Sequence, residues 1–203
     1  MLKSKHIIKC CLALAISTSV FSQAHHISKY EKSWALAHPF TALKVNSRLK
    51  QAMIVYHKVK DSKLLDGFES GGTLDAFRHS FTMAYLAQSI NPKKLRKLGI
   101  AHEKGNKLQF EKNDLENGER VDSLACEMDL RNNELGFIIG SKHKKMPIDS
   151  LKLEIIDQIA QGNAWKLKKN NQNQYISCNN EPILEDNYKK QWFLPKCLIR
   201  SNE

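Results

Sequence analysis

The sequence predicts a mainly α fold: a single orthogonal or bundle-like helical domain of about five helices, with a short irregular or β segment at the C-terminus. Apolar residues recur every three or four positions in several stretches, which is typical of amphipathic helices. Glycines and an Asn-Pro pair separate these stretches. A length of 203 residues with 41% hydrophobic residues suits one globular core.

Residues 1–24 are typical of a secretory signal peptide. Lysines precede an apolar stretch over residues 10–21, and the segment ends in the small residues that a signal peptidase recognises. We therefore expect cleavage after Ala24 and a secreted or periplasmic protein. Residues 25–38 are expected to form a leader, and residues 39–203 the helical domain.

Apolar spacing and caps predict the first three helices. Apolar residues step by three and four from Ala42 to Val59, and the three glycines within residues 66–72 end that pattern. Asn91 and Pro92 are expected to cap and begin the third helix. The second helix is expected to be capped by Thr73, and its apolar stripe comprises Leu74, Phe77, Phe81 and Tyr85.

A long loop and a further helix are expected next. The polar stretch 105–122 predicts a loop that suits a lid over a site. The following helix starts at about Ser123 and carries Asn132 at an apolar position, so this side chain should be buried and hydrogen-bonded. Gly136 and Gly140 on a neighbouring stripe should allow another backbone to approach closely.

The last predicted helix spans residues 148–161 and ends at Gly162. The remaining residues, 163–203, are called the C-terminal extension below. It is expected to be irregular, with a short strand at Tyr175-Ile176 and an apolar anchor over residues 192–194.

Three cysteines follow the predicted cleavage site. Cys178 and Cys197 are the disulfide candidate in an oxidising compartment, and they would staple the C-terminal extension. Cys126 should then remain free and buried. No Cys-x-x-Cys pair is present, which excludes zinc ribbons and thioredoxin-like redox sites.

The chain is basic, with 32 Lys and Arg residues against 21 Asp and Glu residues. Lysine runs such as Lys142, Lys144 and Lys145 suit an anionic envelope component or an anionic substrate, and nucleic acid stays open as a partner. Solvated lysine-rich faces explain the same runs, because no aromatic residues interleave them. No stable membrane span is expected.

Polar residues on three predicted helices form the candidate site. Residues three and four apart share one helix face, and helices that pack their apolar stripes together bring such faces to one place. His and carboxylate groups gathered in this way bind a divalent metal ion or act as general acid and base. In chain order the candidates are Asp75, Arg78, His79, His102, Glu103, Asp129, Asn132 and Asn133.

Three blocks of the sequence resemble the signature of a bacterial domain family of unknown function. They are Asp75-Ala76-Phe77-Arg78-His79, Ala101-His102-Glu103 and residues 128–136. The family resembles a mostly helical module of secreted proteins and of polymorphic-toxin C-termini, and the family-like core covers residues 39–162. The resemblance implies a shared site without an established reaction. The chain departs from the family pattern at residues 80–83.

One hypothesis is a secreted, effector-like hydrolase. His79, His102 and Asp129 are its candidate metal ligands, with Glu103 as general base and Arg78 holding an anionic substrate. His79 would also act directly in the reaction. Adjacent helix residues point about 100° apart, so only one of His102 and Glu103 can face the reacting atom. Phospholipid, nucleic acid and cell-wall glycan remain open as substrates.

The other residues of the candidate site are expected to support it or to be structural. These are Asp75, Asn132, Asn133 and Gly136. The alternative hypothesis takes the whole set as a buried structural network. The protein would then be a non-catalytic periplasmic or extracellular binding module with a basic surface.

Several motif-defined activities are excluded. No second histidine follows His102-Glu103 at the spacing of a zincin motif. Gly71-Gly72 lacks the Lys-Ser or Lys-Thr pair of a phosphate-binding loop, and no Gly-x-Ser-x-Gly elbow is present.

Overall fold

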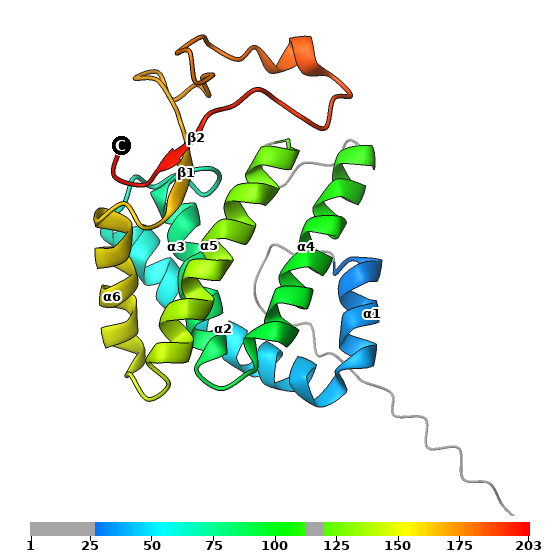
Figure 1. Cartoon of the computed structure of the whole chain (residues 1–203), viewed down its shortest axis with the longest axis vertical. Coiled ribbons are helices and arrows are strands. Elements are labelled where there is room, and N and C mark those ends of the chain that lie inside the picture. Colours follow the sequence, from blue (N-terminus) through cyan, green and yellow to red (C-terminus); the bar gives the residue numbers. More distant parts are fainter. Residues whose placement is uncertain (1–26, 113–119) are drawn as a thin grey trace, which may run out of the picture.

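The computed structural model describes residues 27–112 and 120–203. The predicted mainly α fold is confirmed (Figure 1). No helix within the described residues is long and apolar enough to cross a bilayer. The helices in this part of the chain are α1 (Lys29–Ala37), α2 (Pro39–Ser62), α3 (Thr73–Ala87), α4 (Pro92–Lys112), α5 (Ser123–Lys142) and α6 (Ile148–Ala160).

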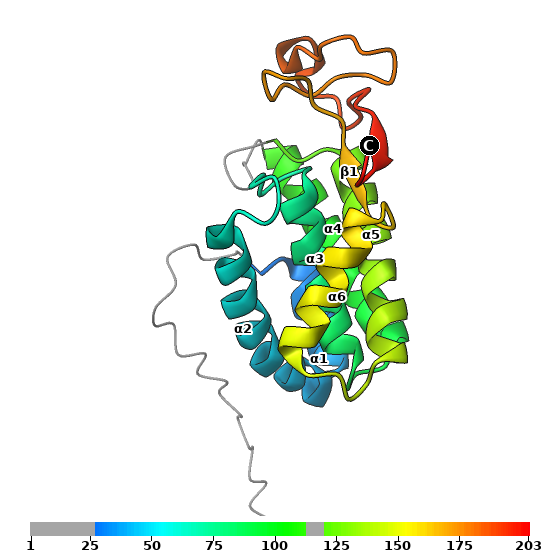
Figure 2. The same ribbon diagram turned by 90° about the vertical axis from the view of Figure 1, so that its left-hand side faces the viewer.

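Helix α3 forms the centre of the domain. Helices α2, α5 and α6 pack around it (Figure 2). The sequence of α3 is apolar on nearly every side, and most of its residues are buried. Within it, Phe77 and Phe81 stack with ring centroids 5.1 Å apart. A second cluster, around Trp34 and Leu95, joins α1, α2 and α4.

Two glycines bring α5 into backbone contact with α3. A Cβ atom added at Gly136 would lie 2.9 Å from the Ala84 nitrogen, and one at Gly140 would lie 2.8 Å from Ala84 Cα. Side chains larger than hydrogen do not fit at these distances. The close approach predicted for these glycines is therefore confirmed.

The predicted leader, residues 25–38, is wrong for most of its length because it contains α1. Ser28 caps this helix: its hydroxyl accepts a hydrogen bond from the Glu31 N–H, and the Glu31 carboxylate accepts one from the Ser28 N–H. Trp34, on the same helix, is buried in the core. The folded domain therefore begins before residue 39.

The predicted loop over residues 105–122 is wrong in its first part, because α4 continues to Lys112. Polar Asn106 lies inside the protein, only 2% exposed, so polarity here does not mark a loop. The remainder of the predicted lid, residues 113–119, lies outside the described residues. The predicted start of α5 at Ser123 is confirmed.

The C-terminal extension forms a small antiparallel sheet of β1 (Trp165–Leu167) and β2 (Leu198–Arg200), and a 3-10 helix over Glu185–Tyr188. The strand predicted at Tyr175-Ile176 is reduced to two single bridges. Of the predicted anchor at 192–194, Leu194 is fully buried whereas Phe193 is 59% exposed.

Candidate functional site

The turn before α3 is fixed by two aspartates. The Asp66 carboxylate accepts hydrogen bonds from the backbone N–H groups of Thr73 and Leu74, which takes over the capping predicted for Thr73. Gly72 is the N-cap residue, and as a glycine it has no side chain with which to cap the helix. Within the same turn, the Gly71 N–H donates to Asp75 Oδ2 at 2.8 Å.

Asp75 is buried and ion-paired. Its Oδ1 accepts hydrogen bonds from Arg78 Nε at 3.1 Å and Nη2 at 2.6 Å. Burial opposes ionisation of Asp75, but the charge of Arg78 and the contact with His79 hold the pKa of that carboxyl below its usual range. Asp75 is therefore a carboxylate at neutral pH.

His79 lies between two carboxylates. Its Nε2 atom is 3.4 Å from Asp75 Oδ1 and 3.3 Å from Asp129 Oδ1. The Nε2 atom is buried, and it makes no hydrogen bond of acceptable geometry to any described residue. One donor atom from each of these three residues lies within 4.8 Å of the others, and we call the three the Asp–His–Asp cluster.

Glu103 lies inside the domain but outside this cluster. Its Oε2 accepts a hydrogen bond from Asn106 Nδ2 at 2.9 Å. Burial, together with the Glu103 carboxylate, raises the pKa of the Cys126 thiol above its usual range, so this free, buried cysteine stays a thiol. The prediction that Cys126 is free and buried is confirmed. Glu103 of α4 lies near Cys126 of α5 and so belongs to the contact between these helices.

His102 does not lie with His79 and Asp129; the third residue of the cluster is Asp75. His102 Nδ1 instead lies 3.2 Å from Glu31 Oε1 on α1. Burial opposes ionisation of Glu31, but hydrogen bonds with His102 and Ser28 lower its pKa to about 2. As expected for adjacent helix residues, His102 and Glu103 serve different contacts.

The two asparagines also separate. Asn132 is fully buried; its Nδ2 donates to the Trp165 carbonyl at 3.0 Å, and its Oδ1 accepts from the Trp165 N–H at 2.9 Å. This confirms that Asn132 is buried and hydrogen-bonded, and it fixes β1 to α5. Asn133 is buried against Gly99 of α4. Asn132 therefore links α5 to β1, and Asn133 lies where α5 meets α4.

A second polar group, which sequence reasoning missed, lies near Arg78. The Tyr56 hydroxyl donates to Glu69 Oε1 at 2.9 Å, and Lys60 lies 2.7 Å from Glu69 Oε2. Burial and the Glu69 carboxylate raise the pKa of Tyr56 above its usual range, and the charge of Arg78 opposes this in part. Tyr56 falls at one of the apolar steps between Ala42 and Val59, so its spacing predicts a core residue and does not indicate the contact of its hydroxyl.

The C-terminal extension is attached to the turn before α3 and to the start of α5. The Tyr175 hydroxyl donates to the Ser70 carbonyl at 3.2 Å. Lys196 Nζ lies 2.7 Å from Asp122 Oδ2, and both side chains are almost completely buried. A disulfide joins Cys178 and Cys197, as predicted. Lys196 and Asp122 were not predicted, since nothing in the sequence pairs them.

A family described as a domain of unknown function, DUF6973, matches residues 32–163. The chain belongs to this family. The matched DUF6973 region runs from within α1 to just after the end of α6, and it contains all three residues of the Asp–His–Asp cluster. The C-terminal extension lies almost wholly outside it. Neither the curated proteins nor the solved structures give a match.

Proposed function

We propose that the protein is a secreted, metal-dependent hydrolase whose divalent ion is held by Asp75, His79 and Asp129. The observation that carries this proposal is the position of His79 Nε2. It is a buried nitrogen without a well-formed hydrogen bond among the described residues, and it lies 3.3 and 3.4 Å from two carboxylate oxygens. A purely structural histidine would be expected to form a good hydrogen bond there.

The two separations from His79 Nε2 to the carboxylate oxygens, 3.4 and 3.3 Å, suit atoms that share one ion. Ligand atoms that each lie about 2.1 Å from one ion are separated by roughly 3.0–3.5 Å at tetrahedral or octahedral angles. One imidazole nitrogen and two carboxylate oxygens suit a first-row divalent metal. When bound, such an ion would polarise a bond of the substrate and lower the pKa of a water molecule.

The protein's own residues support an anionic substrate. Arg78 contacts the Asp–His–Asp cluster through Asp75 and has 19% of its side chain accessible, so a substrate could approach beside it. A guanidinium binds phosphate oxygens in pairs. This favours a phosphodiester, as found in phospholipid and nucleic acid, over a neutral cell-wall glycan. Glu103 supports the fold near the site in this proposal and is not the base.

Metal content tests the proposal. The purified protein is loaded in turn with Mn²⁺, Fe²⁺ and Zn²⁺, desalted and subjected to elemental analysis, beside Asp129→Asn. The control is Glu127→Gln on the same helix, whose carboxylate is exposed and pairs with Arg131. We expect a stoichiometric ion in the parent and the control, its loss in Asp129→Asn, and a chelator-sensitive melting temperature only where the ion binds.

The opposite result assigns the cluster to structure. If the parent holds no ion and His79→Ala lowers the melting temperature strongly, the three side chains form a structural network. A host-growth assay adds a functional readout: export of the parent to the periplasm should slow growth, and His79→Ala should relieve this while the protein stays folded.

A further inference from the structure

Large apolar side chains are exposed where α1 meets α2. Phe40 is 88% exposed, Leu36 83% and Leu43 57%. Leu36 lies in the last turn of α1, and the other two lie in the first turns of α2. Single exposed apolar residues are common on proteins, whereas several on adjacent turns favour a binding surface. We call these three residues the apolar patch.

The apolar patch is held on a fixed frame. Beneath it, the buried Trp34 donates a hydrogen bond from Nε1 to the Lys94 carbonyl at 3.1 Å. Lys44 Nζ donates to the Ser89 carbonyl at 2.9 Å, which ties α2 to the turn between α3 and α4. The exposed side chains therefore project from a junction whose helices are held in place by these hydrogen bonds.

The same end of the domain is strongly basic. It is formed by residues 36–50, 86–98 and 141–148, which lie together at one end in both views (Figures 1 and 2). Gln88 joins the last two segments, since its Nε2 donates to the carbonyls of His143 and Met146. None of the three segments contains Asp or Glu, and together they contain Lys44, Arg48, Lys50, Lys93, Lys94, Arg96, Lys97, Lys142, Lys144 and Lys145. Of these, Arg96 is paired with Glu134 of α5.

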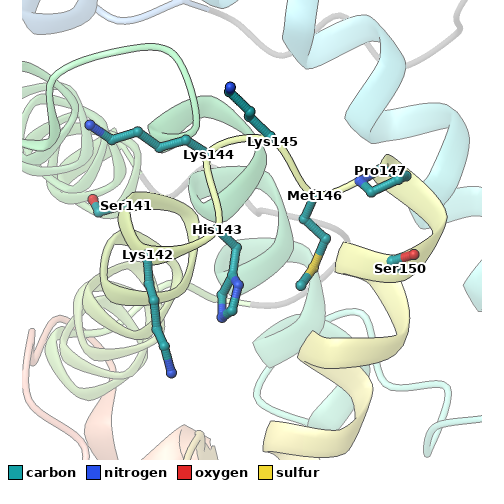
Figure 3. Close-up of a pocket in the computed structure, with 8 residues that line it drawn as sticks. All are labelled: Ser141, Lys142, His143, Lys144, Lys145, Met146, Pro147 and Ser150. Atoms are coloured by element: carbon teal, nitrogen blue, oxygen red, sulfur yellow. The ribbon is translucent and has the colours of Figure 1, made fainter.

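The turn between α5 and α6 adds a hollow of about 650 Å³. Figure 3 shows its lysine side chains spreading from the turn, with Lys144 and Lys145 on one side and Lys142 on the other. These three lysines are exposed. Asp149, which follows in the first turn of α6, is paired with Lys152. The turn therefore presents three exposed lysine charges to solvent.

We propose that this end of the domain docks on a membrane surface rich in anionic phospholipid. Apolar side chains bind a bilayer by entering the boundary between headgroups and acyl chains, and surrounding lysines attract the anionic headgroups. The apolar patch and the lysines at the same end of the domain supply these two contributions. Nucleic acid would use the lysines but leave Phe40 and Leu36 in water. The proposal does not rest on the hydrolase activity.

Vesicle flotation tests the docking surface. The purified protein is mixed with vesicles of phosphatidylglycerol or of phosphatidylcholine, and bound protein is measured after flotation. We expect binding to phosphatidylglycerol and a loss of about tenfold or more for Phe40→Ser. The control is Phe193→Ser, another exposed phenylalanine in the C-terminal extension at the opposite end of the molecule, which should bind like the parent.

A second pair of variants tests the basic part. Lys144→Gln with Lys145→Gln should weaken binding about tenfold or more, because each lysine near an anionic surface contributes about 1 kcal/mol. Lys189→Gln with Lys190→Gln removes the same charge from the C-terminal extension and should change binding little. All variants share one N-terminus, so any contribution of residues 1–24 is common to them.

Fluorescence reports insertion directly. Phe40→Trp should add an emission component that shifts to the blue with phosphatidylglycerol vesicles, and Phe193→Trp should add none that shifts. The proposal is overturned if the parent does not float, if Phe40→Ser binds like the parent, or if both lysine pairs have equal effects. Binding of a single-stranded oligonucleotide that depends on Lys144 and Lys145, without vesicle binding, would assign the surface to nucleic acid instead.

Discussion

Replacing Gly136 by alanine should push α5 away from α3 next to the Asp–His–Asp cluster. The added Cβ would lie 2.9 Å from the Ala84 nitrogen and closer still to the Ser80 carbonyl oxygen. Both are backbone atoms of a buried helix, so neither can rotate away. Ser80 follows His79 directly, and Asp129 lies two turns before Gly136 on α5. The separation would therefore reach the donor atoms of the cluster.

The expected size of the effect comes from two opposing contributions. Overpacking of a well-packed contact costs about 1–3 kcal/mol, and a contact between rigid backbones belongs at the upper end. Alanine in place of glycine inside a helix returns about 1 kcal/mol. The net loss in the free energy of unfolding is about 2 kcal/mol, which lowers the melting temperature of a chain this long by about 4–8 °C.

Urea denaturation of Gly136→Ala beside Gly99→Ala measures this difference. Gly99 is also a buried helical glycine, but an added Cβ there would meet only side-chain atoms, Asn133 Nδ2 at 3.1 Å and Leu130 Cδ2 at 3.8 Å. Gly99→Ala should match the parent or gain up to about 1 kcal/mol. Equal unfolding midpoints for Gly136→Ala and the parent would refute the reasoning.

Three further changes test other contacts. Asn132→Ala leaves the N–H and carbonyl of Trp165 without their partners, so urea denaturation should show a loss of about 2 kcal/mol or more; an unchanged midpoint would contradict this. Lys196→Met removes the counter-charge of the buried Asp122 carboxylate, which keeps only the hydrogen bonds from the Leu124 and Ala125 N–H groups. The expected loss in the same assay is about 3 kcal/mol, and a loss under about 1 kcal/mol would show that these two hydrogen bonds suffice for the carboxylate. Glu31 has a pKa of about 2 in the folded protein against an ordinary 4.5, so its stabilising contribution is present above pH 4.5 and is lost as the pH falls toward 2. Glu31→Gln should therefore lose less stability than the parent in thermal melts over that pH interval, and equal losses would exclude the assigned contact.

The helices were predictable because apolar spacing reports which face of a segment is buried. The stripe from Leu74 to Tyr85 and the Asn91-Pro92 start both reappear in the structure. Helix α1 was missed although Ser28 and Glu31 form a recognisable capping box, because the segment follows a predicted signal peptide. The full length of α4 was missed because Asn106 is polar and yet buried, and a polar residue held by a distant partner looks like a loop residue in the sequence.

The site was predictable only in part, for a different reason. Helical spacing places Asp75 and His79 on one face, and the structure confirms that they meet. Which residues of other helices face them depends on how the helices are rotated against each other, and spacing within one helix does not contain this information. Asp129 was therefore placed with His79 correctly, whereas His102, on a helix that also borders α1, faces Glu31 instead.

Residues outside the family match also help to position the Asp–His–Asp cluster. The Gly71 N–H donates to Asp75 while its carbonyl accepts a hydrogen bond from the Leu167 N–H in β1. Trp165, two residues earlier in the same strand, is hydrogen-bonded to Asn132, which lies one turn along α5 from Asp129. One short strand thus fixes both sides of the cluster. A DUF6973 domain without a comparable strand would need other partners for its Gly71 and Asn132 positions to keep the same spacing between the two carboxylates.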